Sequence, residues 1–379
     1  MNHKFIITMA VALLSAHSLF AMTPLPDDST LRRYAASMLM VGFKGDVVTD
    51  DSDAARYVRD LHVGAIVLFD VDLTGDATIG SRNITGKQQL SRLTAKLKSM
   101  ADSPLLIALD QEGGKVARLK PQYGYKATVA AQHLGDFDNE DTTRRYTRQM
   151  AEEIAQSGVN VNLAPVVDIL NPQCPPLGKI QRCFSTDPAV IVRQARWMID
   201  EHHRQGVLCT LKHFPGHGNA INDSHYGLVD VTRYWSETDL EPFKLLIADG
   251  QADLIMTAHI FNNHIDPDYP ATLSRKTIDG VLRRQLGYDG VVVTDDLYMQ
   301  GIIDNYKVEE AVVLSINAGA DLICVGNNIS TGFESERPFL LVDMIVKAVK
   351  EGRIPWERLQ QSHRRLLKLQ AKLQKQEAR

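Results

Sequence analysis

Ionisable side chains stand at or shortly after the ends of five successive apolar runs of the sequence. In chain order they are Asp110, Asp168, Lys212 with His213, His259, and Asp295 with Asp296. The runs are short and mostly lack polar alternation, as expected of strands buried on both faces of a parallel sheet. Because catalytic side chains of such sheets stand at the carboxyl ends of the strands, the pattern predicts one site that faces a polar ligand.

Asp295 is the candidate nucleophile of that site. It follows the run at 290–294 and lies beside a second carboxylate, Asp296. Paired carboxylates are the usual means of cleaving a glycosidic bond, and a carboxylate can form the covalent intermediate of such a reaction. The alternative is that the pair caps the following helical segment. A cap rarely needs two aspartates, so the pair favours chemistry, even if one of the two also caps.

His225 is the candidate general acid/base, with Asp223 as its partner. An imidazole titrates near neutrality, which suits a group that first donates a proton and then takes one back. The Asp-Ser-His spacing allows the Asp223 carboxylate to meet the ring and stabilise its cation. A loop histidine is more often a surface residue, but the nearby Phe-Pro-Gly-His-Gly sequence favours a catalytic loop. His217 and Glu112 are the next candidates for the proton donor.

Lys212 and His213 follow the run at 207–211. A lysine at the edge of a buried strand is costly unless it meets a polar ligand or an acid. Two alternatives to ligand binding are an internal salt bridge to Asp110 or Asp168 and a Schiff-base lysine.

Histidines near the same strand ends also suggest a metal-dependent hydrolase. They are His213, His217, His225, His259 and His264. The sequence contains neither His-Glu-x-x-His nor a His-x-His on an early strand, which are the usual zinc-binding patterns. We therefore expect no metal and no cofactor.

Eight apolar runs alternate with helical patterns along the chain. They cover residues 38–43, 64–69, 105–109, 159–163, 207–211, 252–257, 290–294 and 320–325. Eight such units predict an α/β fold with a single (β/α)₈ barrel, whose first units are the least regular. The alternative, a doubly wound open sheet, is disfavoured because no Gly-rich dinucleotide fingerprint follows an early strand.

Composition and the N-terminal segment indicate an exported globular protein. The 379 residues carry 42 Lys and Arg against 46 Asp and Glu, which disfavours a nucleic-acid binder that works through a basic surface. Residues 1–21 resemble a secretory signal, with Lys4 before an apolar run at 5–14 and small residues after it. That run is too short to span a membrane. We expect signal cleavage, a mature chain of residues 22–379, no stable membrane insertion, and a periplasmic or secreted location.

Four cysteines remain in the exported chain. Cys174 and Cys183 lie in one Pro-rich loop, and in an oxidising compartment we predict that they pair. This disulfide would tether Arg182. Cys209 and Cys324 lie inside apolar runs and are expected to be buried thiols.

Four segments together resemble glycoside hydrolase family 3, in its single-domain β-N-acetylglucosaminidase branch. They are DQEGGKVARL at 110–119, LKHFPGHG at 211–218 with DSHYGL at 223–228, MTAHI at 256–260 and VVVTDDLYM at 291–299. The resemblance covers about residues 30 to 370, and it implies that residues 22–379 form one catalytic barrel of this family's N-terminal type. Three features depart from the family pattern: Lys115 replaces an arginine, Asn219 stands where an acidic residue is common, and the segment around Arg182 reads KIQRCFS where an Arg-Ser-Phe version is more usual.

The resemblance implies a retaining mechanism in which Asp295 is the nucleophile, His225 the acid/base and Asp223 its dyad partner. It also implies that the sugar hydroxyls are bound by Asp110, Arg118, Arg182, Lys212 and His213. The implied activity is removal of terminal non-reducing N-acetylglucosamine from cell-wall fragments or chitooligosaccharides by a β-N-acetylhexosaminidase. The alternatives are a β-glucosidase-like barrel glycosidase and a non-catalytic cell-wall sugar-binding protein. Binding alone needs neither a nucleophile nor an acid/base, which disfavours the second alternative.

Overall fold

The structure of the protein is a computed structural model that describes residues 25–75, 77–222, 227–329 and 332–377. The expected signal segment, the predicted acid/base His225 and its partner Asp223 lie outside these residues. Within the described part of the chain, no helix combines the length and the apolar character that crossing a membrane requires.

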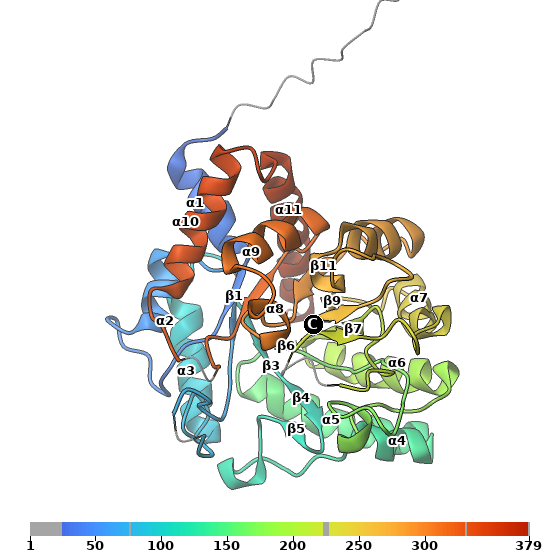
Figure 1. Ribbon diagram of the computed structural model, residues 1–379. Coiled ribbons are helices and arrows are strands. Elements are labelled where there is room, and N and C mark those ends of the chain that lie inside the picture. Colours follow the sequence, from blue (N-terminus) through green and yellow to red (C-terminus); the bar gives the residue numbers. More distant parts are fainter. Residues whose placement is uncertain (1–24, 76, 223–226, 330–331, 378–379) are drawn as a thin grey trace, which may run out of the picture.

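Eight parallel strands form the centre of the molecule (Figure 1). They are β1 (Leu39–Val41), β2 (Ala65–Val67), β3 (Leu106–Leu109), β6 (Val161–Asn162), β7 (Leu208–Phe214), β9 (Leu254–Thr257), β11 (Val291–Thr294) and β12 (Ile323–Val325). Their order in the sheet is β11-β9-β7-β6-β3-β2-β1-β12. A parallel bridge between Val293 and Leu322 joins the two ends of this order. The sheet is therefore a barrel. Seven of the predicted apolar runs contain a whole strand, whereas the run at 207–211 covers only the first part of β7, which continues to Phe214.

Helices surround the strands and connect them (Figure 1). The long ones are α1 (Asp28–Ser37), α3 (Lys87–Met100), α5 (Glu140–Gln156), α6 (Pro188–Arg204), α7 (Glu241–Ala248), η7 (Lys276–Gln285), α9 (Val308–Ala318), α10 (Arg337–Lys350) and α11 (Trp356–Glu377). Shorter helical pieces are α2 (Asp53–Ala55), η1 (Arg56–Asp60), η2 (Pro121–Tyr123), α4 (Ala131–Phe137), η3 (Gly178–Ile180), η5 (Glu237–Leu240), η6 (Ala271–Leu273) and α8 (Gln300–Ile303). Short strands β4 (Gln111–Gly113) and β5 (Val116–Ala117) form a hairpin, and β8 (Val229–Asp230) pairs with β10 (Ile260–Phe261).

The helix boundaries follow from local sequence. Asn139 precedes α5, and its side chain accepts a hydrogen bond from the backbone N–H of Thr142. Asp187 accepts one from Ala189 in the same way before α6, whose first residue is Pro188. Both arrangements satisfy N–H groups that have no partner inside the helix, and proline is well suited to the first helical position.

The strands bury both of their faces, which explains their continuous apolar character. Alternate residues, such as Val67, Ala108 and Val293, pack together inside the barrel, while neighbours such as Ile66 pack outward against the helices. Three leucines of α11 join the interior cluster: Leu366, Leu369 and Leu373. The core is thus divided by the sheet into an inner cluster and an outer layer, as expected of a (β/α)₈ barrel.

All four cysteines are buried free thiols. The predicted Cys174–Cys183 disulfide is therefore absent from the structure. Both side chains instead belong to an apolar cluster beneath the loop that carries Arg182, and burial raises the pKa of each thiol. Apolar packing, rather than a covalent bond, holds this loop here.

Candidate active site

A cavity of about 640 Å³ lies at the carboxyl ends of the barrel strands. Its lining includes six of the residues predicted from the sequence: Asp110, Arg118, Arg182, Lys212, His213 and Asp295. They come from the ends of β3, β7 and β11 and from two of the loops that follow the strands. The fold therefore brings together residues that are far apart in the sequence.

Asp110 is held between two cations at the end of β3. Its carboxylate accepts hydrogen bonds from Arg118 Nη2 at 3.0 Å and from Lys212 Nζ at 2.8 Å. Burial would raise the pKa of Asp110, but the charges of Lys212 and Arg118 outweigh burial and hold it well below the usual range. Asp110 is therefore an anionic acceptor with a fixed orientation at the cavity wall.

The β4–β5 hairpin places Arg118. The Gln111 side-chain oxygen accepts the backbone N–H of Arg118 at 2.8 Å and that of Leu119 at 2.9 Å. Gly113 lies in this hairpin with φ 105°, and a Cβ atom there would stand 2.2 Å from the Val129 carbonyl oxygen. Glycine is the residue that permits both this backbone conformation and this close approach.

Glu112 is a central residue of the site that the sequence indicated only as a reserve proton donor. It does not line the cavity. Its carboxylate accepts two hydrogen bonds from Arg182, both at 2.7 Å, and forms an ion pair with Lys212 Nζ at 2.6 Å. Burial would raise the pKa of Glu112, but the Arg182 and Lys212 charges lower it to about 2. A carboxylate this acidic orients the two cations and is a poor proton donor near neutral pH.

Lys212 forms the predicted salt bridge to Asp110 and a second one to Glu112. Burial alone would lower its pKa, but the two carboxylates raise it. A Schiff-base lysine needs an unprotonated amine, so these surroundings disfavour that alternative.

His213 is oriented by Asp168, which is fully buried. The Asp168 carboxylate accepts the His213 backbone N–H at 3.1 Å and contacts ring atom Nδ1 at 2.7 Å. Its other oxygen accepts the backbone N–H of His217 at 2.7 Å. Ring atom Nε2 faces Arg182 Nη2 at 3.4 Å. Since a guanidinium only donates, the neutral ring carries its proton on Nδ1, toward Asp168.

His217 lies beneath this arrangement and is buried. Burial first, and then the nearby His213, lower the pKa of His217 to about 4. Its imidazole is therefore neutral near pH 7, which makes it a weak general acid there.

Asp295 and Asp296 have different surroundings. Asp295 lines the cavity, and its carboxylate accepts the backbone N–H of Asp296 at 2.9 Å. Asp296 accepts the backbone N–H groups of Tyr298 and Gly326, each at 3.0 Å. Burial, aided by the Asp295 charge, raises the pKa of Asp296 to about 6 despite these donors. Asp296 thus organises the turn after β11. It does not cap the following helix α8 (Gln300–Ile303), whose N-cap residue is Met299 and which has no side-chain cap.

The other predicted strand-end histidine, His259, supports that turn from behind. Its ring atom Nε2 lies 2.9 Å from the Asp296 carbonyl oxygen, and Nδ1 lies 2.9 Å from the Thr272 hydroxyl. The ring is fully buried and is absent from the cavity lining. Among the described residues, no group of three or more His, Cys, Asp and Glu side chains is arranged to hold a metal ion.

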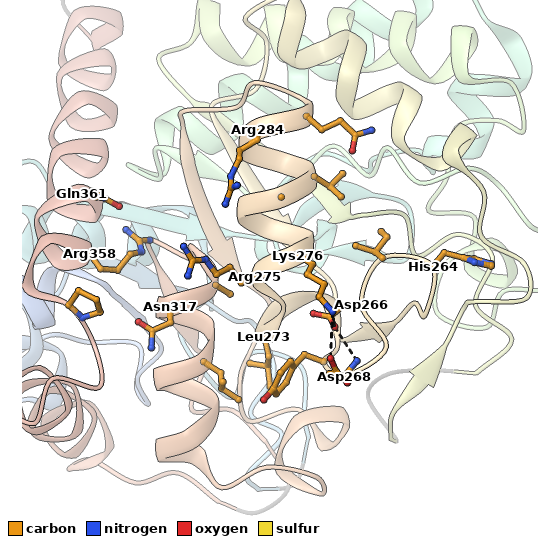
Figure 2. A pocket seen from close by; sticks show the side chains of 18 of the residues that line it. His264, Asp266, Asp268, Leu273, Arg275, Lys276, Arg284, Asn317, Arg358 and Gln361 are labelled. Atoms are coloured by element: carbon orange, nitrogen blue, oxygen red, sulfur yellow. Dashed lines mark hydrogen bonds and ion pairs between the residues drawn. The ribbon is translucent and has the colours of Figure 1, made fainter. Parts of the chain in front are cut away.

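A larger cavity, of about 1170 Å³, is lined by His264 but by none of the six residues that line the first cavity and were predicted from the sequence. Figure 2 shows that Arg358 and Gln361 lie on one side of it and Lys276, Asp266 and Asp268 on the other. Lys276 pairs with both aspartates, at 3.2 and 3.5 Å. This cavity opens among η7, α9 and α11. The smaller cavity is the candidate active site, because the described residues predicted at the strand ends line it.

Comparison with known proteins identifies the family of the chain. Residues 30–369 match the model of the "Glycosyl hydrolase family 3 N terminal domain". A "Beta-hexosaminidase" of Tolumonas auensis is 34% identical over 73% of this chain and 80% of its own. "Beta-hexosaminidase A" of Pseudoalteromonas piscicida is 31% identical over 95% of this chain, which spans 64% of that protein.

Solved structures give the same result. A glycoside hydrolase family 3 β-N-acetylglucosaminidase from a Paenibacillus species has a TM-score of 0.80 and 35% identity, over 91% of this chain and 62% of that one. A β-N-acetylhexosaminidase from Beutenbergia cavernae has a TM-score of 0.79 and 26% identity, over 90% and 98%. The chain belongs to glycosyl hydrolase family 3, and it is a glycoside hydrolase.

Proposed function

We propose that the protein is an exported, retaining β-N-acetylglucosaminidase that removes terminal non-reducing N-acetylglucosamine from oligosaccharides. The observation that carries the proposal is the cavity that holds the Asp295 carboxylate together with the Asp110, Arg118, Arg182 and Lys212 cluster. The names of the relatives support N-acetylglucosamine as the sugar that is removed. The predicted signal segment at residues 1–21 supports export.

Asp295 attacks the anomeric carbon while the bond to the leaving oxygen breaks. His225 gives its proton to that oxygen, and a glycosyl ester on Asp295 results. In the second step His225 takes a proton from water, the water oxygen attacks the anomeric carbon, and Asp295 leaves as a carboxylate. Asp223 holds the imidazole in the required tautomer. The two inversions give net retention of the anomeric configuration.

The ion-paired cluster binds the sugar hydroxyls. Arg118, Arg182 and Lys212 donate hydrogen bonds, and Asp110 accepts them, from positions already fixed by their mutual pairing. Fixed donors and acceptors hold the anomeric carbon in place without reorganisation, which is how positioning lowers a barrier.

His225 remains the best candidate for the proton donor because the two reserves are poorly suited to the task. Glu112 is ionised in two ion pairs, and the buried imidazole of His217 is neutral near pH 7. His225→Ala should therefore slow a natural disaccharide much more than the bond-breaking step of a nitrophenyl glycoside, whose leaving group needs no proton. A burst of nitrophenol should also appear. Equal slowing of both substrates without a burst would contradict this role.

The function itself is tested by comparing nitrophenyl β-N-acetylglucosaminide with nitrophenyl β-glucoside. We expect hydrolysis of the first substrate to be strongly preferred, with the β-anomer as the first sugar product by NMR. Preference for the glucoside would favour the β-glucosidase-like alternative, and an α-anomer would exclude retention. Export is tested separately, by fractionation and by sequencing the N-terminus of the mature protein.

A further inference from the structure

The Thr–His row, made of the side chains of Thr257, Thr272 and His259, joins the end of β9 to the turn that follows Asp295. The Thr257 hydroxyl lies 2.9 Å from the Thr272 hydroxyl, which lies 2.9 Å from ring atom Nδ1 of His259. Ring atom Nε2 of His259 lies 2.9 Å from the Asp296 carbonyl oxygen. All three side chains are completely buried. Because β9 pairs with β11, the row connects the ends of two neighbouring strands.

The proton on Nε2 of His259 is fixed by the partner of that atom. A carbonyl oxygen only accepts hydrogen bonds, so Nε2 donates to Asp296. The Thr272 hydroxyl has one proton and two acceptors within reach, which are Nδ1 of His259 and the Ala258 carbonyl oxygen at 2.8 Å. Whichever acceptor takes that proton, the bond from Nε2 to the Asp296 carbonyl remains.

The backbone of Asp296 in turn holds the Asp295 carboxylate. The Asp296 N–H donates to this carboxylate at 2.9 Å. The Asp296 carbonyl accepts from His259 and, at 3.0 Å, from the Met299 N–H. A rotation of the Asp296 backbone that broke the bond to His259 would also turn its N–H away from Asp295. The Asp295 N–H donates to the Thr257 carbonyl oxygen at 3.2 Å, so the strand that carries the row also holds the backbone of the nucleophile.

We propose that His259 is a positioning residue for the nucleophile. Through the Asp296 backbone it holds the Asp295 carboxylate in the direction of the anomeric carbon, and the two threonines of the row hold His259. Since His259 is absent from the described lining of the cavity, it acts through Asp296 rather than on the sugar. The inference rests on the proposed function, in which Asp295 forms the glycosyl ester. A misplacement of about 1 Å is costly to such an attack, so loss of the row should slow formation of the ester more than it weakens sugar binding.

The first test is His259→Phe, which keeps a buried ring and removes both nitrogen atoms. The neighbours stay bonded, since the Asp296 carbonyl keeps the Met299 N–H and the Thr272 hydroxyl keeps the Ala258 carbonyl. We expect the rate at which a slow fluorinated N-acetylglucosaminyl substrate labels the nucleophile to fall on the order of 10²-fold. The dissociation constant of N-acetylglucosamine, measured by competitive inhibition, should stay within about threefold of wild type.

Thr272 tests the row without changing the histidine. Thr272→Val keeps the shape of the side chain and removes its hydroxyl, and it should lower the labelling rate about tenfold. Thr272→Ser restores the hydroxyl and should stay within about twofold of wild type. The matched control is Thr210→Val on β7. Thr210 is equally buried, and its hydroxyl has no hydrogen-bond partner among the described residues, so its removal should change neither the labelling rate nor the stability.

Two results would overturn the inference. A labelling rate for His259→Phe within about threefold of wild type would mean that the nucleophile does not need this support. A labelling rate and an inhibitor affinity that fall by the same factor would mean that the whole site has loosened and that the row is structural only. If His259→Phe does not fold, which thermal unfolding shows, the threonine variants decide: equal labelling rates for Thr272→Val and Thr272→Ser overturn the inference.

Wild-type activity on nitrophenyl β-N-acetylglucosaminide is measured first on the same preparation. If this substrate is not cleaved, the proposed function fails. If it is cleaved, and the His259 and Thr272 variants label as fast as wild type, the function stands and the inference about His259 fails.

Discussion

The two ends of the barrel both concentrate buried aspartates beside arginines and lysines, but only one end surrounds the candidate active-site cavity. At the amino end, Asp321 is fully buried and accepts hydrogen bonds from Arg283 at 2.6 Å and Arg358 at 2.8 Å. Asp253 pairs there with His203 and with Lys372 of α11. At the carboxyl end, the Asp110, Glu112 and Lys212 cluster stands beside the cavity of about 640 Å³.

The difference lies in what covers each cluster. Helix α11 closes the amino end, where Leu366, Leu369 and Leu373 fill the barrel interior and Arg365 joins Asp321 to Asp289. At the carboxyl end, loops leave the charged residues facing an open volume. Buried ion pairs alone therefore do not mark an active site, whereas ion pairs at the carboxyl ends of barrel strands do.

The largest effect expected is at the carboxyl end, on Asp295. Asp295→Ala should lower kcat on the order of 10³-fold or more, as expected for loss of a covalent nucleophile. Asp296→Ala should cost much less activity, because Asp296 accepts backbone N–H groups instead of forming a bond to the sugar. Steady-state kinetics on the two purified variants decides this. A larger loss at Asp296 would mean that their roles are reversed.

At the amino end the largest expected effect is on stability. Asp321→Asn leaves Arg283, Arg358 and Arg365 without their shared carboxylate and should lower the free energy of unfolding by about 3–5 kcal/mol. kcat of the folded fraction should stay within about twofold of wild type.

The matched control for Asp321 is an exposed ion pair. Asp343 meets Arg32 at 2.7 Å on the surface, so Asp343→Asn should cost less than about 1 kcal/mol. Urea unfolding of both variants measures the difference. Selective loss of kcat in Asp321→Asn would contradict the assignment of stability to the amino end of the barrel and of catalysis to its carboxyl end.

Glu112 tests how the carboxyl end uses its ion pairs. Glu112→Gln should keep the fold but remove the ion pair of Arg182 and leave Lys212 paired with Asp110 alone, and it should lower kcat/KM on the order of 10²-fold. The matched control is Glu153→Gln, which removes a buried carboxylate paired with Lys87 away from the cavity. Kinetics and thermal unfolding of both variants distinguish a loss of activity from a loss of stability. If the two variants lose stability alike and neither loses activity, Glu112 has a structural role only.

The last prediction is a pH dependence of stability at Asp239, whose carboxylate accepts the Ser236 backbone N–H and contacts Asn219. Burial raises the pKa of Asp239 to about 6. The folded protein then holds a proton that the unfolded chain releases, so this group's contribution to stability falls as pH rises from about 4 to 6. Asp239→Asn should remove that part of the slope, at most about 1.4 kcal/mol per pH unit. Parallel slopes for wild type and variant in chemical unfolding would contradict it.

Most of the fold could be predicted from the sequence, because strands buried on both faces are recognisable as continuous apolar runs. Each of the eight apolar runs coincides with a barrel strand, although β7 continues three residues beyond its run, to Phe214. The cavity residues Asp110, Lys212 and Asp295 were also predictable, since each follows such a run. Arg118 and Arg182 lie on loops, and only the family resemblance indicated them.

The pairing of charged residues and the state of the cysteines could not be predicted, because both depend on distances between segments that are far apart in the sequence. Glu112 is adjacent to Asp110 in the sequence, yet its pairing with Arg182 becomes visible only when β3 and the loop after β6 are brought together. The spacing of Cys174 and Cys183 favoured a disulfide, whereas the structure buries both thiols in an apolar cluster. Asp253 and Asp321 stand at the beginning of their apolar runs, which places them at the amino end of the barrel, but their partners Lys372 and Arg358 are far away in the sequence.

The most direct test of the account is to identify the residue that becomes glycosylated. A slow fluorinated N-acetylglucosaminyl substrate should trap the covalent intermediate, and peptide mapping by mass spectrometry should locate the added mass on Asp295. An adduct on Asp296, or turnover with inversion and no adduct, would contradict Asp295 as the nucleophile at the carboxyl end of the barrel.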